Sequence, residues 1–66
     1  MGKISLAAAR VNAGLSQIFV AKTLDIAPST LRNWEKGVTF PKEPMIKAMC
    51  KLYDVQYDDI NFSASE

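Results

Sequence analysis

Residues 17–36 decide the fold of this chain, and they read QIFVAKTLDIAPSTLRNWEK. Ser16 is a good N-cap for a first short helix over residues 17 to about 24. Pro28 suits the first turn of a second short helix, which Gly37 closes. Because the residues between them suffice only for a tight turn, the segment predicts two helices packed against each other at a steep angle.

The two predicted helices have an apolar side toward each other and a polar side away from the contact. The apolar positions are Val20, Ala21, Leu24, Ile26, Leu31 and Trp34. Ala21 stands where the helices cross most closely, and a larger side chain there would force them apart. The opposite side of the second helix must then face outward, and it consists of Pro28, Ser29, Arg32, Asn33 and Lys36. Arginine pairs with guanine, asparagine with adenine and serine with either, so this side has the chemistry of readout in the DNA major groove.

The residues on either side of this pair predict further helices and no strand. Residues 3–13 are rich in strong helix formers and end at Gly14, a typical left-handed stop. Pro44 can open another helix, whose apolar stripe is formed by Met45, Met49, Leu52 and Tyr53. Residues 57–61 allow one last helical turn. The chain is therefore expected to form an all-α domain of five helices.

Length and composition indicate one small domain that lacks the residues common in enzyme active sites. The chain has 66 residues, 48% of them hydrophobic, so it supports one core, which we place in residues 1–62, with 63–66 as a frayed tail. It has one cysteine, Cys50, and no histidine. We therefore expect no catalytic residue, no metal and no cofactor. No apolar run approaches the ~20 residues of a membrane span, which predicts a cytoplasmic protein without a membrane partner.

The net charge of +1 hides an uneven distribution along the chain. Residues 1–36 contain five basic and two acidic residues, for a net charge of +3. Residues 37–66 contain three basic and five acidic residues, for a net charge of −2. Such a chain can present a basic face to a polyanion and keep its acidic groups away from it, although solvation alone explains the charges equally well.

Several segments together resemble one known family. They are Gly14-Leu15-Ser16-Gln17, Val20-Ala21, Leu24-Asp25-Ile26, Thr30-Leu31, Trp34-Glu35-Lys36-Gly37, Pro41, Met49-Cys50-Lys51-Leu52-Tyr53-Asp54-Val55 and Asp58-Asp59-Ile60. They look like the phage-repressor and Cro-like helix-turn-helix family, also called the XRE family. The resemblance covers nearly the whole chain and implies a compact five-helix, lambda-repressor-like DNA-binding domain, with the helix-turn-helix at residues 17–36.

The resemblance implies a role for each of the exposed polar positions. Gln17 is similar to a glutamine that hydrogen-bonds a DNA phosphate at the N-terminus of its helix. Ser29, Arg32 and Asn33 match positions that reach base edges, and Pro28 matches one whose contact here is apolar. The phosphate candidates around the following loop are Lys36, Thr39 and Lys42.

Other positions match structural roles in the family or depart from its pattern. Arg10 and Glu35 match a pair that in several members forms an ion pair between the first and third helices. Asp25 stands where the family prefers glycine, and aspartate tolerates a left-handed backbone better than most residues. Ala27 replaces the usual serine or threonine cap of the third helix, a loss of ~1 kcal/mol.

The sequence therefore predicts a repressor-type regulator of transcription from a phage or similar mobile element, acting in a bacterial cell or phage-infected host. We expect a weak homodimer, completed on a near-palindromic operator in duplex DNA. The alternative is a protein-interaction module on the same fold, an antirepressor, modulator or antitoxin, with an apolar face around Ile18 and Phe19. The dimer or partner contacts are expected at Phe19, Tyr57, Ile60 and Phe62. A loosely docked C-terminus explains the last three equally well. Phe19 and the apolar residues Ala7, Ala8 and Val11 are also explained as extra core residues or as scattered hydrophobic residues on the surface.

Overall fold

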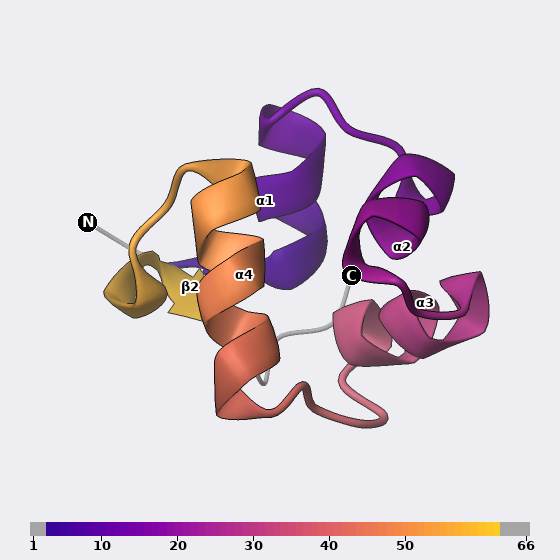
Figure 1. The fold of residues 1–66 in the computed structure, drawn as a ribbon. Helices are drawn as coiled ribbons and strands as arrows, with labels where there is room; N and C mark the ends of the chain where they lie inside the picture. Colours follow the sequence, from indigo (N-terminus) through magenta and orange to yellow (C-terminus); the bar gives the residue numbers. More distant parts are fainter. Residues whose placement is uncertain (1–2, 63–66) are drawn as a thin grey trace.

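The computed structural model describes residues 3–62, which form four α-helices and two very short strands (Figure 1). The elements run in the order β1 (Ile4–Ser5), α1 (Leu6–Asn12), α2 (Gln17–Leu24), α3 (Pro28–Lys36), α4 (Glu43–Tyr53), the 3-10 turn η1 (Tyr57–Asp59) and β2 (Ile60–Asn61). α2 and α3 lie together on one side of the molecule, and the segment after α4 lies on the other side (Figure 1).

Local signals place the ends of the helix pair. The Ser16 hydroxyl accepts a hydrogen bond from the Phe19 N–H at 3.0 Å, and α2 begins at the next residue. α2 ends at Leu24, and the next residue, Asp25, caps it in the left-handed conformation with φ 58°. α3 begins at Pro28 and ends at Lys36, and the next residue, Gly37, is also left-handed, with φ 77°. The predicted bounds of both helices are confirmed.

The core lies where α1, α2, α3 and α4 meet. Its buried hydrophobic residues are Leu6, Ala9, Val20, Ala21, Leu31, Met49, Tyr53 and Ile60. Full burial of a side chain as large as that of Leu31 or Met49 stabilises the fold by ~1.5–3 kcal/mol. Ala21 is 1% exposed, in agreement with a small residue where the two helices meet.

The two ends of the described chain pair as parallel strands, so the prediction of no strand is wrong. Ile4 pairs with Ile60, and Ser5 with Asn61. The first helix was predicted from residue 3 but begins at Leu6, because the extended backbone of Ser5 belongs to β1. The Ser5 hydroxyl accepts the Ala8 N–H at 3.0 Å and caps α1.

The predicted fifth helix at residues 57–61 is also wrong, because a 3-10 turn and β2 take its place. Ile60 is 3% exposed and belongs to the core, which corrects its prediction as a partner contact. Phe62 is half-buried against the core, and its ring centroid lies 5.5 Å from that of Tyr57. The tail predicted at 63–66 lies outside the described residues.

Candidate nucleic-acid interface

α3 divides its residues between the core and the surface as the sequence predicts. Leu31 is fully buried and Trp34 packs against the core. The outward side is formed by residues that are all exposed: Pro28, Ser29, Arg32, Asn33 and Lys36. This side presents a guanidinium, a carboxamide, a hydroxyl and an ammonium group along one helix face. These are donors and acceptors of the kind that read base edges and bind phosphates.

Besides Lys36, the phosphate candidates come from α2 and from the loop after α3. Thr39 and Lys42 are exposed in the loop between α3 and α4. Lys42 is the last residue before α4 and caps it without a side-chain hydrogen bond. Gln17, the first residue of α2, is half-buried, and its carboxamide Nε2 donates to Glu35 Oε1 at 2.8 Å.

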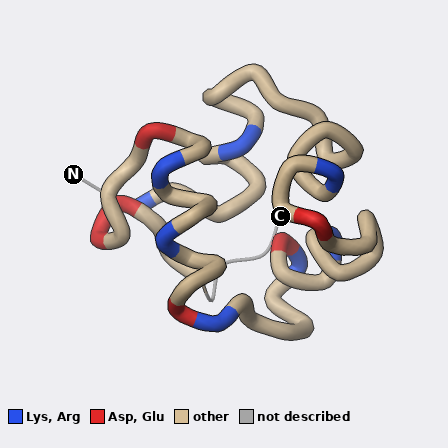
Figure 2. Tube along the Cα trace, in the orientation of Figure 1, with Lys and Arg blue, Asp and Glu red and all other residues tan. Residues whose placement is uncertain are grey.

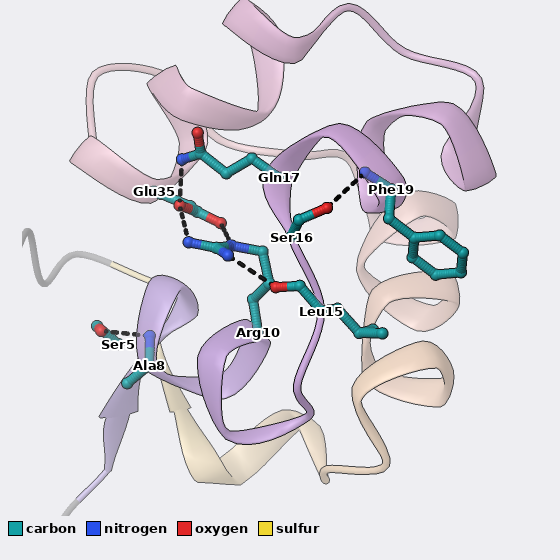
Figure 3. A network of polar contacts seen from close by, with 8 residues as sticks. All are labelled: Ser5, Ala8, Arg10, Leu15, Ser16, Gln17, Phe19 and Glu35. Atoms are coloured by element: carbon teal, nitrogen blue, oxygen red, sulfur yellow. Dashed lines mark hydrogen bonds and ion pairs between the residues drawn. The ribbon is translucent and has the colours of Figure 1, made fainter.

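Glu35 is the centre of a polar network that joins α1, α2 and α3 (Figure 3). Arg10 Nε donates to Glu35 Oε2 at 2.7 Å, and Arg10 Nη2 reaches Oε1 at 3.4 Å. Arg10 Nη1 donates to the Leu15 carbonyl at 2.8 Å. The side chains of Arg10 and Glu35 are 14% and 5% exposed, so the ion pair is largely withdrawn from water.

The hydroxyl of Tyr53 lies in the field of this network. It is buried and has no hydrogen-bond partner among the described residues. Burial raises the pKa of Tyr53 above its ordinary value of 10.0, and the negative charge of Glu35 adds to the rise, while Arg10 lowers it. The folded protein therefore favours the neutral phenol over the phenolate.

The acidic residues after α4 lie away from the polar side of α3. In Figure 2 the acidic positions of residues 54–59 lie on the far side of the molecule from α2 and α3. α4 itself carries the basic residues Lys47 and Lys51, both exposed. Basic charge is thus present on more than one side, and α3 combines two exposed basic residues, Arg32 and Lys36, with the exposed Ser29 and Asn33.

The apolar outer side of α1 lines a groove of about 540 Å³ beside α3. Ala7, Ala8 and Val11 contribute from α1, and Arg32 and Lys36 contribute from α3. Ala7 and Ala8 are half-buried and Val11 is 61% exposed. The groove borders the face of α3 that carries the predicted base contacts.

The partner-contact candidates differ in exposure. Ile18 is 73% exposed and Phe19 is 50% exposed, and the Phe19 ring points away from the Glu35 network (Figure 3). Tyr57 is 59% exposed, while Ile60 is buried. An apolar surface on α2 and one ring of η1 are therefore available to a partner.

Residues 3–62 contain no group of three or more His, Cys, Asp or Glu side chains placed to hold a metal ion. No helix in the same range has the length and apolar character needed to cross a bilayer. Cys50 is half-buried in α4, and burial, followed by the charge of Asp59, raises the pKa of its thiol. A thiol with a raised pKa is a poor nucleophile at neutral pH.

Two members of the network were missed at the level of sequence. The Gln17 bond to Glu35 joins residues 18 positions apart, and the Leu15 carbonyl is a backbone group that no side-chain pattern reveals. The sequence contains one signal for this network. Glu35 is an acidic residue that follows the inward-facing Leu31 and Trp34 near the end of the helix.

Comparison with known families agrees with this geometry. A family model described as Helix-turn-helix matches residues 6–60, which include all four α-helices of the described chain. No curated protein and no solved structure matches the chain. The matched range covers most of the chain and contains every position of α3 that faces outward.

Proposed function

The chain belongs to the helix-turn-helix family of phage-repressor and Cro-like (XRE) DNA-binding regulators, and on this premise we propose that it is a sequence-specific repressor of transcription. The observation that carries the proposal is the division of α3, in which Leu31 is buried while Arg32 and Asn33 are exposed beside it. A helix of this width enters the major groove of B-DNA with its exposed side toward the bases.

Three residues are proposed to read base edges. Arg32 donates two hydrogen bonds to a guanine, Asn33 exchanges two with an adenine, and Ser29 bonds either. Pro28 has no N–H to donate, so its contact is apolar, for example with a thymine methyl group. Each bidentate contact is worth ~1–3 kcal/mol of discrimination against a wrong base.

The contacts to the DNA backbone are assigned to residues around this face. Gln17, Lys36, Thr39 and Lys42 are proposed to bind phosphates and to set the orientation of α3 in the groove. Lys36 and Lys42 displace counterions when they neutralise phosphates, so the affinity for DNA falls steeply with salt.

Two copies are proposed to bind a near-palindromic operator, with their α3 helices in successive major grooves ~34 Å or ~10 base pairs apart. Tyr57 and Phe62, whose ring centroids lie 5.5 Å apart with the ring planes tilted by 31°, are the proposed dimer contact. Two aromatic side chains bury little area, so the dimer is weak in solution and is completed on DNA. The assignment to a phage or mobile element rests on the resemblance to phage repressors.

Selection of binding sites from a pool of random duplexes tests the proposal. We expect enrichment of one sequence repeated with two-fold symmetry at a spacing of ~10 base pairs. Arg32→Ala then weakens binding to the selected operator by ~1–3 kcal/mol per half-site and relaxes the preference at one base pair of each half-site. An enriched pool without a common sequence, or an Arg32→Ala variant that binds as wild type does, contradicts base readout.

A second candidate function is favoured by the exposure of Ile18 and Phe19 on α2. The same fold would then hold a protein partner through an apolar face, as an antirepressor, modulator or antitoxin does. Retention of the wild-type chain on nonspecific duplex DNA at low salt supports the first function. Binding of a protein partner that does not depend on salt, and that Phe19→Ser abolishes, supports the second.

A further inference from the structure

We infer that Glu35 is a positioning residue that orients the carboxamide of Gln17 toward DNA phosphate, an inference that rests on the proposed DNA-binding function. Glu35 is 5% exposed and lies beneath the surface, so it acts through the half-buried Gln17 and not through DNA itself. The two residues come from different helices, α3 and α2.

The acceptor on Glu35 is held firmly in place. Arg10 Nε binds Glu35 Oε2 at 2.7 Å, while Glu35 Oε1 accepts Gln17 Nε2 at 2.8 Å. Arg10 is itself tied to the Leu15 carbonyl at 2.8 Å, in the turn that leads into α2. The carboxylate thus stands at a defined distance from the first residue of α2.

The charge of Glu35 also decides which way the Gln17 carboxamide faces. An ionised carboxylate is an acceptor and not a donor, so it attracts the NH₂ group of a carboxamide and repels its oxygen. The Gln17 nitrogen accordingly faces Glu35 and its oxygen points away (Figure 3). One N–H is used by Glu35, and because the amide is planar the direction of the second N–H is then set as well.

A glutamine oriented before binding is a better phosphate ligand than a mobile one. A free glutamine loses rotamer freedom when it binds, and it must also choose the correct one of two amide orientations. Glu35 removes both losses in the unbound protein. Arg10 neutralises the carboxylate, so Glu35 does not repel the phosphate that Gln17 binds.

A double-mutant cycle measures this coupling on the selected operator. Gln17→Ala is measured in the wild-type chain and in Glu35→Gln, whose neutral amide accepts either orientation of Gln17. In the wild-type chain Gln17→Ala weakens DNA binding by about tenfold per half-site, the value of one hydrogen bond to a charged group. In Glu35→Gln the same substitution weakens binding by less than about threefold per half-site.

Lys42→Ala is the matched control in both backgrounds. Lys42 is a proposed phosphate ligand that lies outside the Glu35 network and is exposed in the loop before α4. If Glu35 acts through Gln17, Lys42→Ala weakens binding by the same factor in the wild-type chain and in the Glu35→Gln variant. The inference is overturned if Gln17→Ala weakens binding equally in the two backgrounds. It is also overturned if Glu35→Gln reduces the effects of Gln17→Ala and of Lys42→Ala by the same factor.

A measurement on the unmutated protein stands independently of how well Glu35→Gln folds. We expect the side-chain NH₂ of Gln17 in the DNA-free chain to show an NMR order parameter near the ~0.85 of rigid backbone, and that of the exposed Asn33 to lie below ~0.6. A Gln17 amide as mobile as that of Asn33 overturns the inference. If the wild-type chain binds no duplex, the proposed function fails and takes this inference with it. If it binds but the cycle shows no coupling, the inference alone fails.

Discussion

Replacement of Arg10 by methionine tests how much the buried ion pair contributes to stability. The substitution keeps an unbranched side chain of similar length but leaves Glu35, 5% exposed, without its cation. It also removes the donor to the Leu15 carbonyl. A single buried charge without its partner costs ~3–5 kcal/mol, because the desolvation of the carboxylate is no longer offset.

The structure places the expected loss at the lower end of that range. Gln17 still donates to Glu35 at 2.8 Å after Arg10 is gone, so the carboxylate retains one hydrogen bond. We expect a loss of ~3 kcal/mol. A chain of 66 residues has a total stability of ~3–10 kcal/mol, so this one substitution removes a large part of it. At ~4–8 °C per kcal/mol, Tm falls by ~12–24 °C.

Urea denaturation followed by the fluorescence of Trp34, the single tryptophan of the chain, measures the loss. The control is the double variant Arg10→Met, Glu35→Met, which replaces both charges by apolar side chains and is expected to cost less than ~1.5 kcal/mol. A loss below ~1 kcal/mol for Arg10→Met alone, or a double variant as unstable as the single one, refutes the reasoning from an uncompensated charge.

Three further predictions concern α3 and Tyr53. Ala27→Ser adds the side-chain cap that α3 lacks and should raise the free energy of unfolding by ~1 kcal/mol, seen as a higher Tm; an unchanged Tm contradicts it. Tyr53→Phe removes a buried hydroxyl without a partner among the described residues, so at pH 7 it should leave stability unchanged or raise it, as measured in urea. Since burial raises the pKa of Tyr53 above 10.0, the folded state favours the neutral phenol. Wild-type stability should therefore fall as pH rises above about 10, and Tyr53→Phe should fall less; parallel pH profiles count against this.

The helix pair and its outward face could be predicted from the sequence because each signal is local. Ser16 caps the residues that follow it, Pro28 sets its own backbone angle, and Gly37 accepts the left-handed conformation that ends a helix. Helical periodicity then places Leu31 on the inward side of the helix and Arg32 on the outward side. Signals of this kind act within one or two turns, so they can be read from neighbouring residues.

Tertiary structure alone decided the parts that depend on residues far apart in the chain. The strands that pair Ile4 with Ile60 are two residues long each, too short to show the alternation of apolar and polar residues that marks a strand in a sequence. This pairing buries Ile60, which is therefore not exposed to a partner. The Gln17 bond to Glu35 depends on the angle at which α2 crosses α3. Each of these contacts joins residues from two different elements, so the partners are set by how the elements pack and not by signals within one or two turns.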